Sequence, residues 1–145
     1  MNKFLLPYRW KLAGIFLLIA GTVSAIFYIW FDFRFKVPVF AVYSSFLETK
    51  LFSVFRTNFS EELTLLLLIS GLSLVIFSKD KNEFEGLDLI RSRALFKALA
   101  VNNILLFLSV LLIYGSGFIA ILVINIFSFF IFYLLFFYLG KRMKV

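Results

Sequence analysis

Four long apolar runs divide the chain and predict four membrane-spanning helices. An α-helix rises about 1.5 Å per residue and the hydrocarbon core of a bilayer is about 30 Å thick, so about 20 residues are needed to cross it. The second and third runs are short alone and gain length by extension through residues 60–62 and 93–97. The pattern indicates an all-α membrane protein, one integral domain over residues 1–145, with spans at about 12–31, 60–78, 94–114 and 117–140.

The third and fourth apolar runs are joined by the short sequence YGSG at residues 114–117. A link of this length between two helices forces an antiparallel hairpin. Gly115 and Gly117 supply the backbone freedom that a tight reversal requires.

The loop over residues 32–59 contains two patterns that predict local structure. Residues 31–39 alternate apolar and polar side chains, which indicates a half-buried extended segment, with Pro38 favouring an edge position. Ser45 and Glu48 match the S-x-x-E capping box that begins a helix. We therefore expect a short amphipathic helix at the membrane–water boundary, whose apolar face holds Phe46, Leu47, Leu51, Val54 and Phe55.

The positions of the basic residues predict the orientation of the chain. With four spans, 11 lysines and arginines lie on the side of the two termini and the 79–93 loop, and 4 lie on the side of the 32–59 loop. Lysine and arginine are enriched on the cytoplasmic side of a membrane. The sequence therefore predicts a multi-pass protein with both termini and the 79–93 loop in the cytoplasm, and with the 32–59 loop outside.

Composition supports a membrane location and narrows the chemistry. The 145 residues are 63% hydrophobic and include 22 phenylalanines, more than a soluble chain of this length can bury. With no cysteine and no histidine, the chain lacks the usual zinc, haem and iron–sulfur ligands, and we expect no metal and no cofactor. The net charge of +7 comes from bases that flank apolar runs, which favours contact with membrane lipids over binding of nucleic acid.

Polar residues inside the predicted spans indicate contacts between helices. Counted from the YGSG link, Asn103 and Asn125 lie at similar depths in antiparallel helices, and an amide without a partner is costly in hydrocarbon. We expect Asn102 or Asn103 to bond across to Asn125 or Ser128, and contact with a substrate is the alternative. In the first span, Ala20, Gly21, Ser24 and Ala25 form small-xxx-small pairs, a pattern typical either of helix packing within the chain or of a dimer.

The most charged stretch is SKDKNEFEGLDLIRSRALFKALAVNN, residues 78–103. If its second half is helical, Asp88 and Arg91 are three residues apart and can pair. Acids before bases also suit the dipole of a helix that starts near residue 88. Glu83, Glu85, Asp88, Arg91 and Arg93 are therefore predicted to contact either a protein partner at the cytoplasmic surface or the lipid headgroups.

The segments FAVYSSFLETKLF, NFSEELTLLLLISGLSLVIFSKDKNEFE and IRSRAL…VNNILLFL…YGSGF resemble a group of small uncharacterised bacterial inner-membrane proteins. The resemblance covers roughly residues 40–130. It implies a four-helix membrane bundle in the bacterial inner (cytoplasmic) membrane, and it implies no activity.

Two functional hypotheses remain open from the sequence. In the first, the chain is a non-catalytic regulatory, sensory or accessory subunit that acts through contacts with a protein partner or with copies of itself. In the second, it is a small oligomeric transporter or channel. A transporter would be expected to carry an ionisable residue in mid-span or a broken helix, and the sequence shows neither. An enzyme is not expected, because no nucleophile–base pair is visible.

Overall fold

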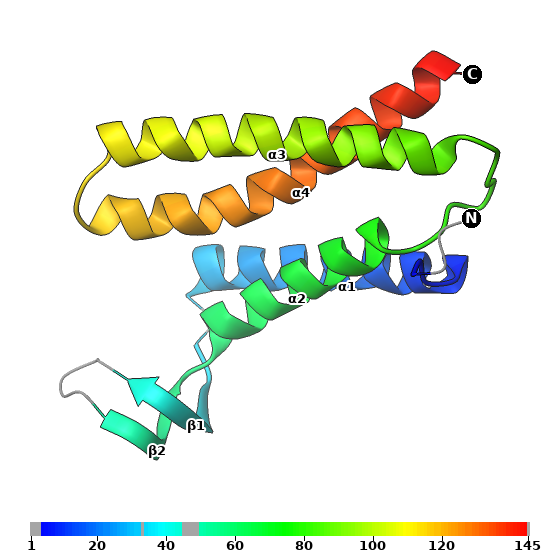
Figure 1. The fold of residues 1–145 in the computed structure, drawn as a ribbon. Coiled ribbons are helices and arrows are strands. Elements are labelled where there is room, and N and C mark those ends of the chain that lie inside the picture. Colours follow the sequence, from blue (N-terminus) through cyan, green and yellow to red (C-terminus); the bar gives the residue numbers. More distant parts are fainter. Residues whose placement is uncertain (1–3, 33, 45–49, 145) are drawn as a thin grey trace. The chain divides into compact units, whose positions relative to one another are not determined.

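The computed structural model describes residues 4–32, 34–44 and 50–144 (Figure 1). In chain order the elements are α1 (Tyr8–Phe31), β1 (Lys36–Ser44), β2 (Lys50–Asn58), α2 (Ser60–Ile76), α3 (Leu87–Leu112) and α4 (Ser116–Lys144). The described residues fall into two compact units. Unit 1 comprises Met1–Gly14 and Leu72–Val145, and unit 2 comprises Ile15–Gly71.

Three of the four helices, α1, α3 and α4, are long and apolar enough to cross a membrane. Many of their large apolar side chains are exposed, among them Phe16 and Phe107. This exposure suits contact with lipid far better than contact with water. The length and composition of these helices support the predicted membrane protein. The prediction of an all-α fold is wrong, because the mostly helical chain also contains the sheet of β1 and β2. Helix α2 has 17 residues, about 25 Å at 1.5 Å per residue, and is shorter than the other three.

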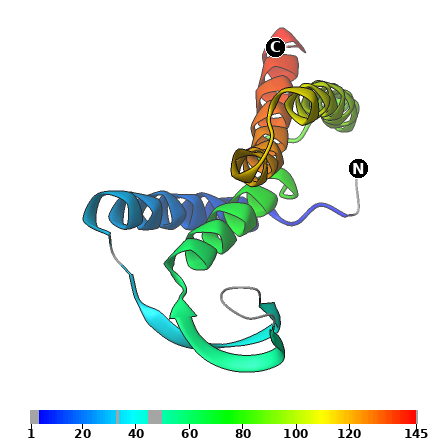
Figure 2. The same cartoon turned by 90° about the vertical axis from the view of Figure 1, so that its left-hand side faces the viewer.

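The helix predicted around residues 46–56 is wrong over the part that the structure describes. There the chain forms β2, which pairs with β1 in an antiparallel hairpin (Figure 2). The extended segment predicted for residues 31–39 is confirmed from Lys36 onward. Phe33 and the capping-box residues Ser45 and Glu48 lie outside the described residues.

Hydrogen bonding explains why a strand forms in place of the predicted helix. An extended β1 alone would leave a row of backbone N–H and C=O groups unpaired, and β2 pairs with it from Lys36 opposite Asn58 to Ser44 opposite Lys50. From Ser53 to Thr57 the described side chains of β2 follow the period of a strand: Ser53 and Thr57 are half-buried, whereas Val54 and Arg56 are exposed.

Helix α2 begins at Ser60, where the sequence predicted a helix start at Ser60, Glu61 and Glu62. Asn58 accepts hydrogen bonds from the backbone N–H of Ser60 (3.2 Å) and from its hydroxyl (2.9 Å). The two glutamates lie in the first turn, where the helix dipole favours negative charge.

In unit 1, α3 and α4 form the predicted antiparallel pair; Figure 2 shows α3 nearly end-on, with α4 beside it. Helix α3 ends at Leu112 and α4 begins at Ser116. Gly115 has a φ of 75°, a conformation that glycine adopts without strain, so the tight reversal predicted from YGSG is confirmed.

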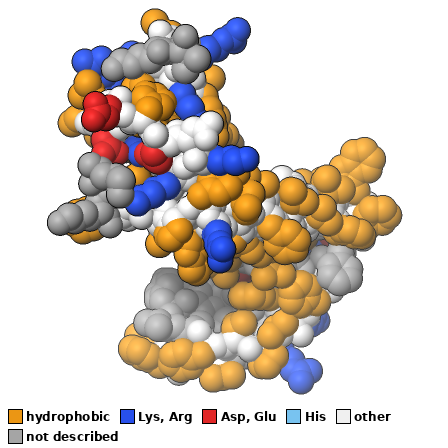
Figure 3. Space-filling view, turned by 90° about the vertical axis from the view of Figure 1, so that its right-hand side faces the viewer, with side chains coloured by type: hydrophobic (Ala, Val, Ile, Leu, Met, Phe, Trp, Pro, Cys, Tyr) orange, Lys and Arg blue, Asp and Glu red, His pale blue; other side chains and the backbone are white. Residues whose placement is uncertain are grey.

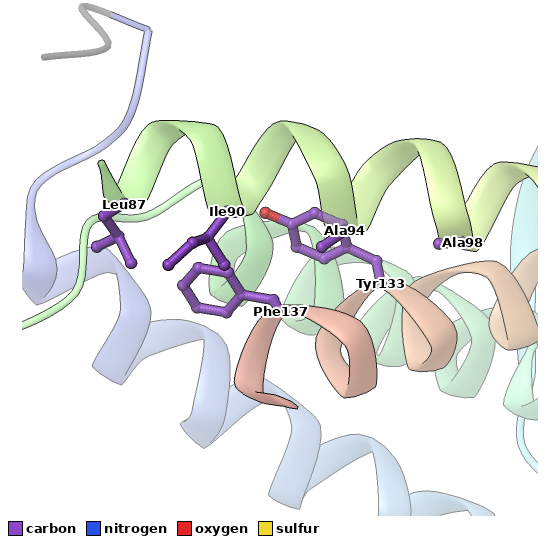
Figure 4. Packing of buried hydrophobic residues seen from close by; sticks show 6 residues of the cluster. All are labelled: Leu87, Ile90, Ala94, Ala98, Tyr133 and Phe137. Carbon is purple, nitrogen blue, oxygen red and sulfur yellow. The ribbon is translucent and has the colours of Figure 1, made fainter. Parts of the chain in front are cut away.

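The core of unit 1 lies between α3 and α4 near the start of α3 (Figure 4). Ala94 and Ala98 are buried on α3, and their small side chains leave room for aromatic rings from α4. The rings of Tyr133 and Phe137 are parallel, with centroids 6.1 Å apart. Leu87 and Ile90 complete the cluster.

The segment before α1 is held beside the segment that follows α2. The backbone N–H of Leu6 donates to the carbonyl oxygen of Phe77, and the N–H of Lys79 donates to the carbonyl oxygen of Leu6, both at 2.8 Å. These bonds form an isolated parallel bridge between Leu6 and Ser78. The bridge brings the first turn of α1 to the loop between α2 and α3.

Candidate functional site

Asp80, in the loop between α2 and α3, lies between two lysines from opposite ends of the chain. Its carboxylate pairs with the ammonium of Lys11 in α1 and, at 2.6 Å, with that of Lys141 in α4. Its side chain is only 7% exposed, and that of Lys11 is 10% exposed. The ion pairs therefore connect α1, the loop and α4 at one end of unit 1.

The pKa of Asp80 reflects two opposing effects. Burial raises the pKa, because it disfavours the charged form. The hydrogen bonds from Lys11 and Lys141 lower it and outweigh burial, so the pKa of Asp80 lies below the ordinary value. The carboxylate is thus held in its charged form by two cations.

A second ion-paired group lies next to Asp80. Arg91 donates two hydrogen bonds to the Glu83 carboxylate, from Nη2 to Oε1 at 2.6 Å and from Nη1 to Oε2 at 3.1 Å. Nη1 also donates to Oδ1 of Asp88 at 3.1 Å. The backbone N–H of Asp80 donates to Oε1 of Glu83 at 2.7 Å, which joins the two groups. We call Lys11, Asp80, Glu83, Asp88, Arg91 and Lys141 the charged cluster.

Arg91 occupies the interior of this end of unit 1. It is 8% exposed, and its guanidinium carbon lies 5.7 Å from the centroid of the Phe137 ring. The two hydrogen bonds from Arg91 lower the pKa of Glu83 and outweigh the raising effect of its burial. Parallel hydrogen bonds between a guanidinium and a carboxylate fix the orientation of both groups, so this pair determines the path of the loop.

The five residues predicted for partner or headgroup contact fall into two groups. Glu83 and Asp88 each accept hydrogen bonds from Arg91, which is buried. Glu85 and Arg93 are exposed. Figure 3 shows acidic side chains close together at this end of unit 1, with lysine and arginine side chains around them. Glu85 and Arg93 are therefore the members of the predicted set that a binding partner can reach without breaking the cluster.

A cavity of about 340 Å³ lies beside Arg91 within unit 1. Its polar wall includes Asp88, Arg91 and Ser92, and its apolar wall includes Phe77 and Phe130. A cavity of this composition can accept an apolar group next to a hydrogen-bonding one.

The predicted polar contact between the third and fourth apolar runs involves Asn102. Asn102 Nδ2 donates to Oδ1 of Asn125 at 3.1 Å, and Asn125 Nδ2 donates to the carbonyl oxygen of Asn102 at 3.3 Å. The Ser128 hydroxyl donates to Oδ1 of Asn102 at 2.7 Å. Asn103 is exposed on another side of α3. The three polar side chains thus satisfy one another between α3 and α4.

The small residues predicted to pack in the first apolar run lie partly against α2. A β-carbon at Gly21 would come within 2.8 Å of Leu68, so glycine permits this close approach. The hydroxyl oxygens of Ser24 and Thr64 are 2.8 Å apart, and the Tyr28 hydroxyl donates to Glu61. Ala20 and Ala25 are half-buried. The packing face therefore includes Gly21 and Ser24, within unit 2.

Sequence reasoning missed the central residue of the charged cluster. Asp80 stands between Lys79 and Lys81 in the sequence, a local pattern typical of a solvated loop. Its partners Lys11 and Lys141 are 69 and 61 residues away, and no local pattern links them to it. All three lie within three residues of the end of an apolar run, and this was the one signal in the sequence that could have grouped them.

Among the described residues, no group of three or more acidic, histidine or cysteine side chains is arranged to hold a metal ion. No family model, curated protein or solved structure matches the chain. The resemblance noted from the sequence therefore stays a prediction.

Proposed function

We propose that the chain is a non-catalytic, multi-pass protein of the bacterial cytoplasmic membrane, a regulatory, sensory or accessory subunit that acts by binding a protein partner. The charged cluster is the observation that supports this proposal best. It fixes the loop between α2 and α3 while leaving Glu85 and Arg93 exposed. A rigid loop with exposed charges of both signs loses little conformational entropy when it binds.

In the proposed topology all four helices cross the membrane, and the charged cluster lies at the cytoplasmic boundary. The distribution of basic residues supports this orientation. Helix α2 is short, and its apolar run extends only from Leu63 to Phe77, but a bilayer thins locally around a short span at modest cost.

The partner contact can be tested by exchanging the exposed charges. A tagged chain with Glu85→Lys and Arg93→Glu keeps its net charge, and neither residue belongs to the charged cluster. We expect the wild-type chain to co-purify with a defined partner from crosslinked membranes, and the double variant to lose that partner while inserting normally. Asp32→Arg/Arg34→Asp, an exchange of two exposed and paired charges that also keeps the net charge, is the matched control and should keep the partner.

Retention of the same partner by the Glu85→Lys/Arg93→Glu chain would contradict the proposed surface. A small oligomeric transporter is the competing function, and it requires a polar path through the membrane. Solute flux through vesicles that contain only this chain, abolished by Asn102→Leu, would contradict the accessory function.

A further inference from the structure

The hairpin in unit 2 has two different faces. The antiparallel register places Val37 and Val39 on one face with Ser53 and Thr57, and these four side chains are half-buried. Leu51 at the far end of that face is 63% exposed. The opposite face is exposed at each position whose side chain is described, apart from half-buried Asn58 at its root. We call it the outer face; its exposed members are Lys36, Pro38, Phe40, Phe52, Val54 and Arg56.

Three large apolar side chains gather on the outer face. Phe40, Phe52 and Val54 are 64%, 69% and 68% exposed. Phe40 lies opposite Val54 in the register, and the Phe40 and Phe52 ring centroids are 6.5 Å apart. A neighbouring pair of exposed phenylalanine rings is unfavourable in water and indicates a surface that another apolar phase covers.

The backbone at Phe52 gives a second indication. Its φ is 49°, in the left-handed region that a bulky residue rarely adopts. Glycine or asparagine would occupy this conformation with less strain. The strained backbone is retained with a side chain whose ring lies beside Phe40 on the exposed face, which is the arrangement expected of a binding surface.

The charge of the hairpin indicates what covers the outer face. Lys36 and Arg56 share the outer face with the apolar side chains, and the sequences of β1 and β2 contain no aspartate or glutamate. Long basic side chains place their stems along apolar surface and their charged ends at phosphate groups. Aromatic and basic residues on one face are the chemistry of an anionic lipid surface.

The root of the hairpin is attached to α2. The backbone N–H of Phe59 donates to the carbonyl oxygen of Phe35 at 3.1 Å, and the N–H of Phe35 donates to the Ser60 hydroxyl at 3.4 Å. Only Phe59 separates the end of β2 from the start of α2. If α1 and α2 cross the membrane, the hairpin is therefore held within reach of the lipid headgroups.

We propose that the outer face of the hairpin rests on the membrane, with Phe40, Phe52 and Val54 in the boundary between headgroups and acyl chains. Lys36 and Arg56 contact the phosphates of anionic lipids. This inference rests on the proposed insertion of α1 and α2, and it names a lipid-binding surface in unit 2.

Site-directed tryptophan fluorescence tests this surface. In a chain with Trp10→Phe and Trp30→Phe, the single tryptophan is introduced as Val54→Trp on the outer face or as Val37→Trp on the opposite face. Each purified chain is reconstituted into vesicles of phosphatidylcholine and phosphatidylglycerol in which a fraction of the lipids carries bromine near the headgroup. We expect a blue-shifted emission and strong loss of fluorescence for Val54→Trp, with much less loss for Val37→Trp.

Two results would overturn the proposed lipid contact, and a third would overturn only the role of anionic lipids. Equal quenching of the two variants by bromolipid, or strong quenching of Val54→Trp by aqueous acrylamide, would show that the outer face does not rest on lipid. A Val54→Trp residue shielded from both bromolipid and acrylamide would assign the face to a second copy of the chain. If quenching persists unchanged in Lys36→Gln/Arg56→Gln, or without phosphatidylglycerol, the anionic part of the proposal is wrong.

Native Trp30 separates this inference from the proposed insertion. In a chain with only Trp10→Phe, Trp30 in α1 should be quenched by bromolipid whether or not the hairpin binds. Quenching of Trp30 without quenching of Val54→Trp would overturn the hairpin surface alone. Absence of quenching at both Trp30 and Val54→Trp would overturn the membrane insertion on which the hairpin surface depends.

Discussion

Lys141, close to the end of α4, donates a 2.6 Å hydrogen bond to the carboxylate of Asp80, which precedes it by 61 residues. Asp80 also pairs with Lys11 in the first turns of α1. One acidic side chain therefore joins segments from the beginning, the middle and the end of the chain. Because both partners of Asp80 are basic, its removal leaves two cations close together.

Asp80→Asn is expected to destabilise the protein. The amide keeps the shape of the carboxylate but not its charge, so Lys11, with a side chain 10% exposed, loses its counter-ion. Removing one partner of a buried ion pair costs about 3 kcal/mol or more. Thermal unfolding in detergent micelles, followed by circular dichroism, measures this loss. Lys81→Gln, an exposed change next to Asp80, should leave the unfolding temperature nearly unchanged.

Stability should fall in acid because of Asp80 and Glu83. The pKa of each carboxyl lies below its ordinary value, which is about 4 in an unfolded chain. A lowered pKa contributes stability that is complete above the ordinary value and is lost as the pH falls through the lowered value. Unfolding temperatures should therefore decline below about pH 4. The double variant Asp80→Asn/Glu83→Gln, less stable at neutral pH, should show a smaller decline; an equal one would contradict this assignment.

Arg91→Lys is expected to destabilise the protein although the charge is kept. Lysine cannot make the two parallel hydrogen bonds to Glu83 together with the bond to Asp88. A hydrogen bond to a charged group contributes about 1.5–3 kcal/mol, so a loss of this size is predicted. Arg93→Lys, on the exposed side of the same helix, is the matched control. Equal unfolding temperatures for the two variants would mean that the geometry of the Arg91 pair contributes nothing.

Asn102 and Asn125 should be energetically coupled. A double-mutant cycle with Asn102→Leu and Asn125→Leu is expected to give a coupling free energy of about 0.5–1.5 kcal/mol, typical of hydrogen bonds between membrane helices. The cycle can be measured by reversible unfolding in mixed micelles. The same cycle with exposed Asn103→Leu in place of Asn102→Leu should give no coupling. Coupling between Asn103 and Asn125 would mean that Asn103, and not Asn102, contacts Asn125.

The sequence predicted the elements that depend on local patterns. Apolar runs and the YGSG link located the four helices and the α3–α4 reversal, because length and composition determine whether a helix can cross a membrane. The segment that forms β2 has an apolar pattern typical of a helix. Leu51, Val54 and Phe55 recur at helical spacing, and the pairing with β1 that decides for a strand is not a property of that segment.

The polar contacts were predictable only where depth in the membrane restricted the partners. Asn125 could be matched to Asn102 or Asn103 because both are counted from one short turn. In the structure it is Asn102 that lies on the side of α3 facing Asn125 and bonds to it. Asp80 could not be matched to Lys11 and Lys141, because the loops that bring them together have no period or fixed length.

We propose that α2 crosses the membrane, so that the chain before α2 and the chain after it lie on opposite sides of the bilayer. Because the chain has no cysteine, a single introduced one reports its own location. Thr57→Cys on β2 and Glu85→Cys in the loop before α3 should be compared in intact spheroplasts with a membrane-impermeant maleimide. We expect labelling of Thr57→Cys at once and of Glu85→Cys only after permeabilisation. Labelling of both positions from the same side would contradict a crossing by α2.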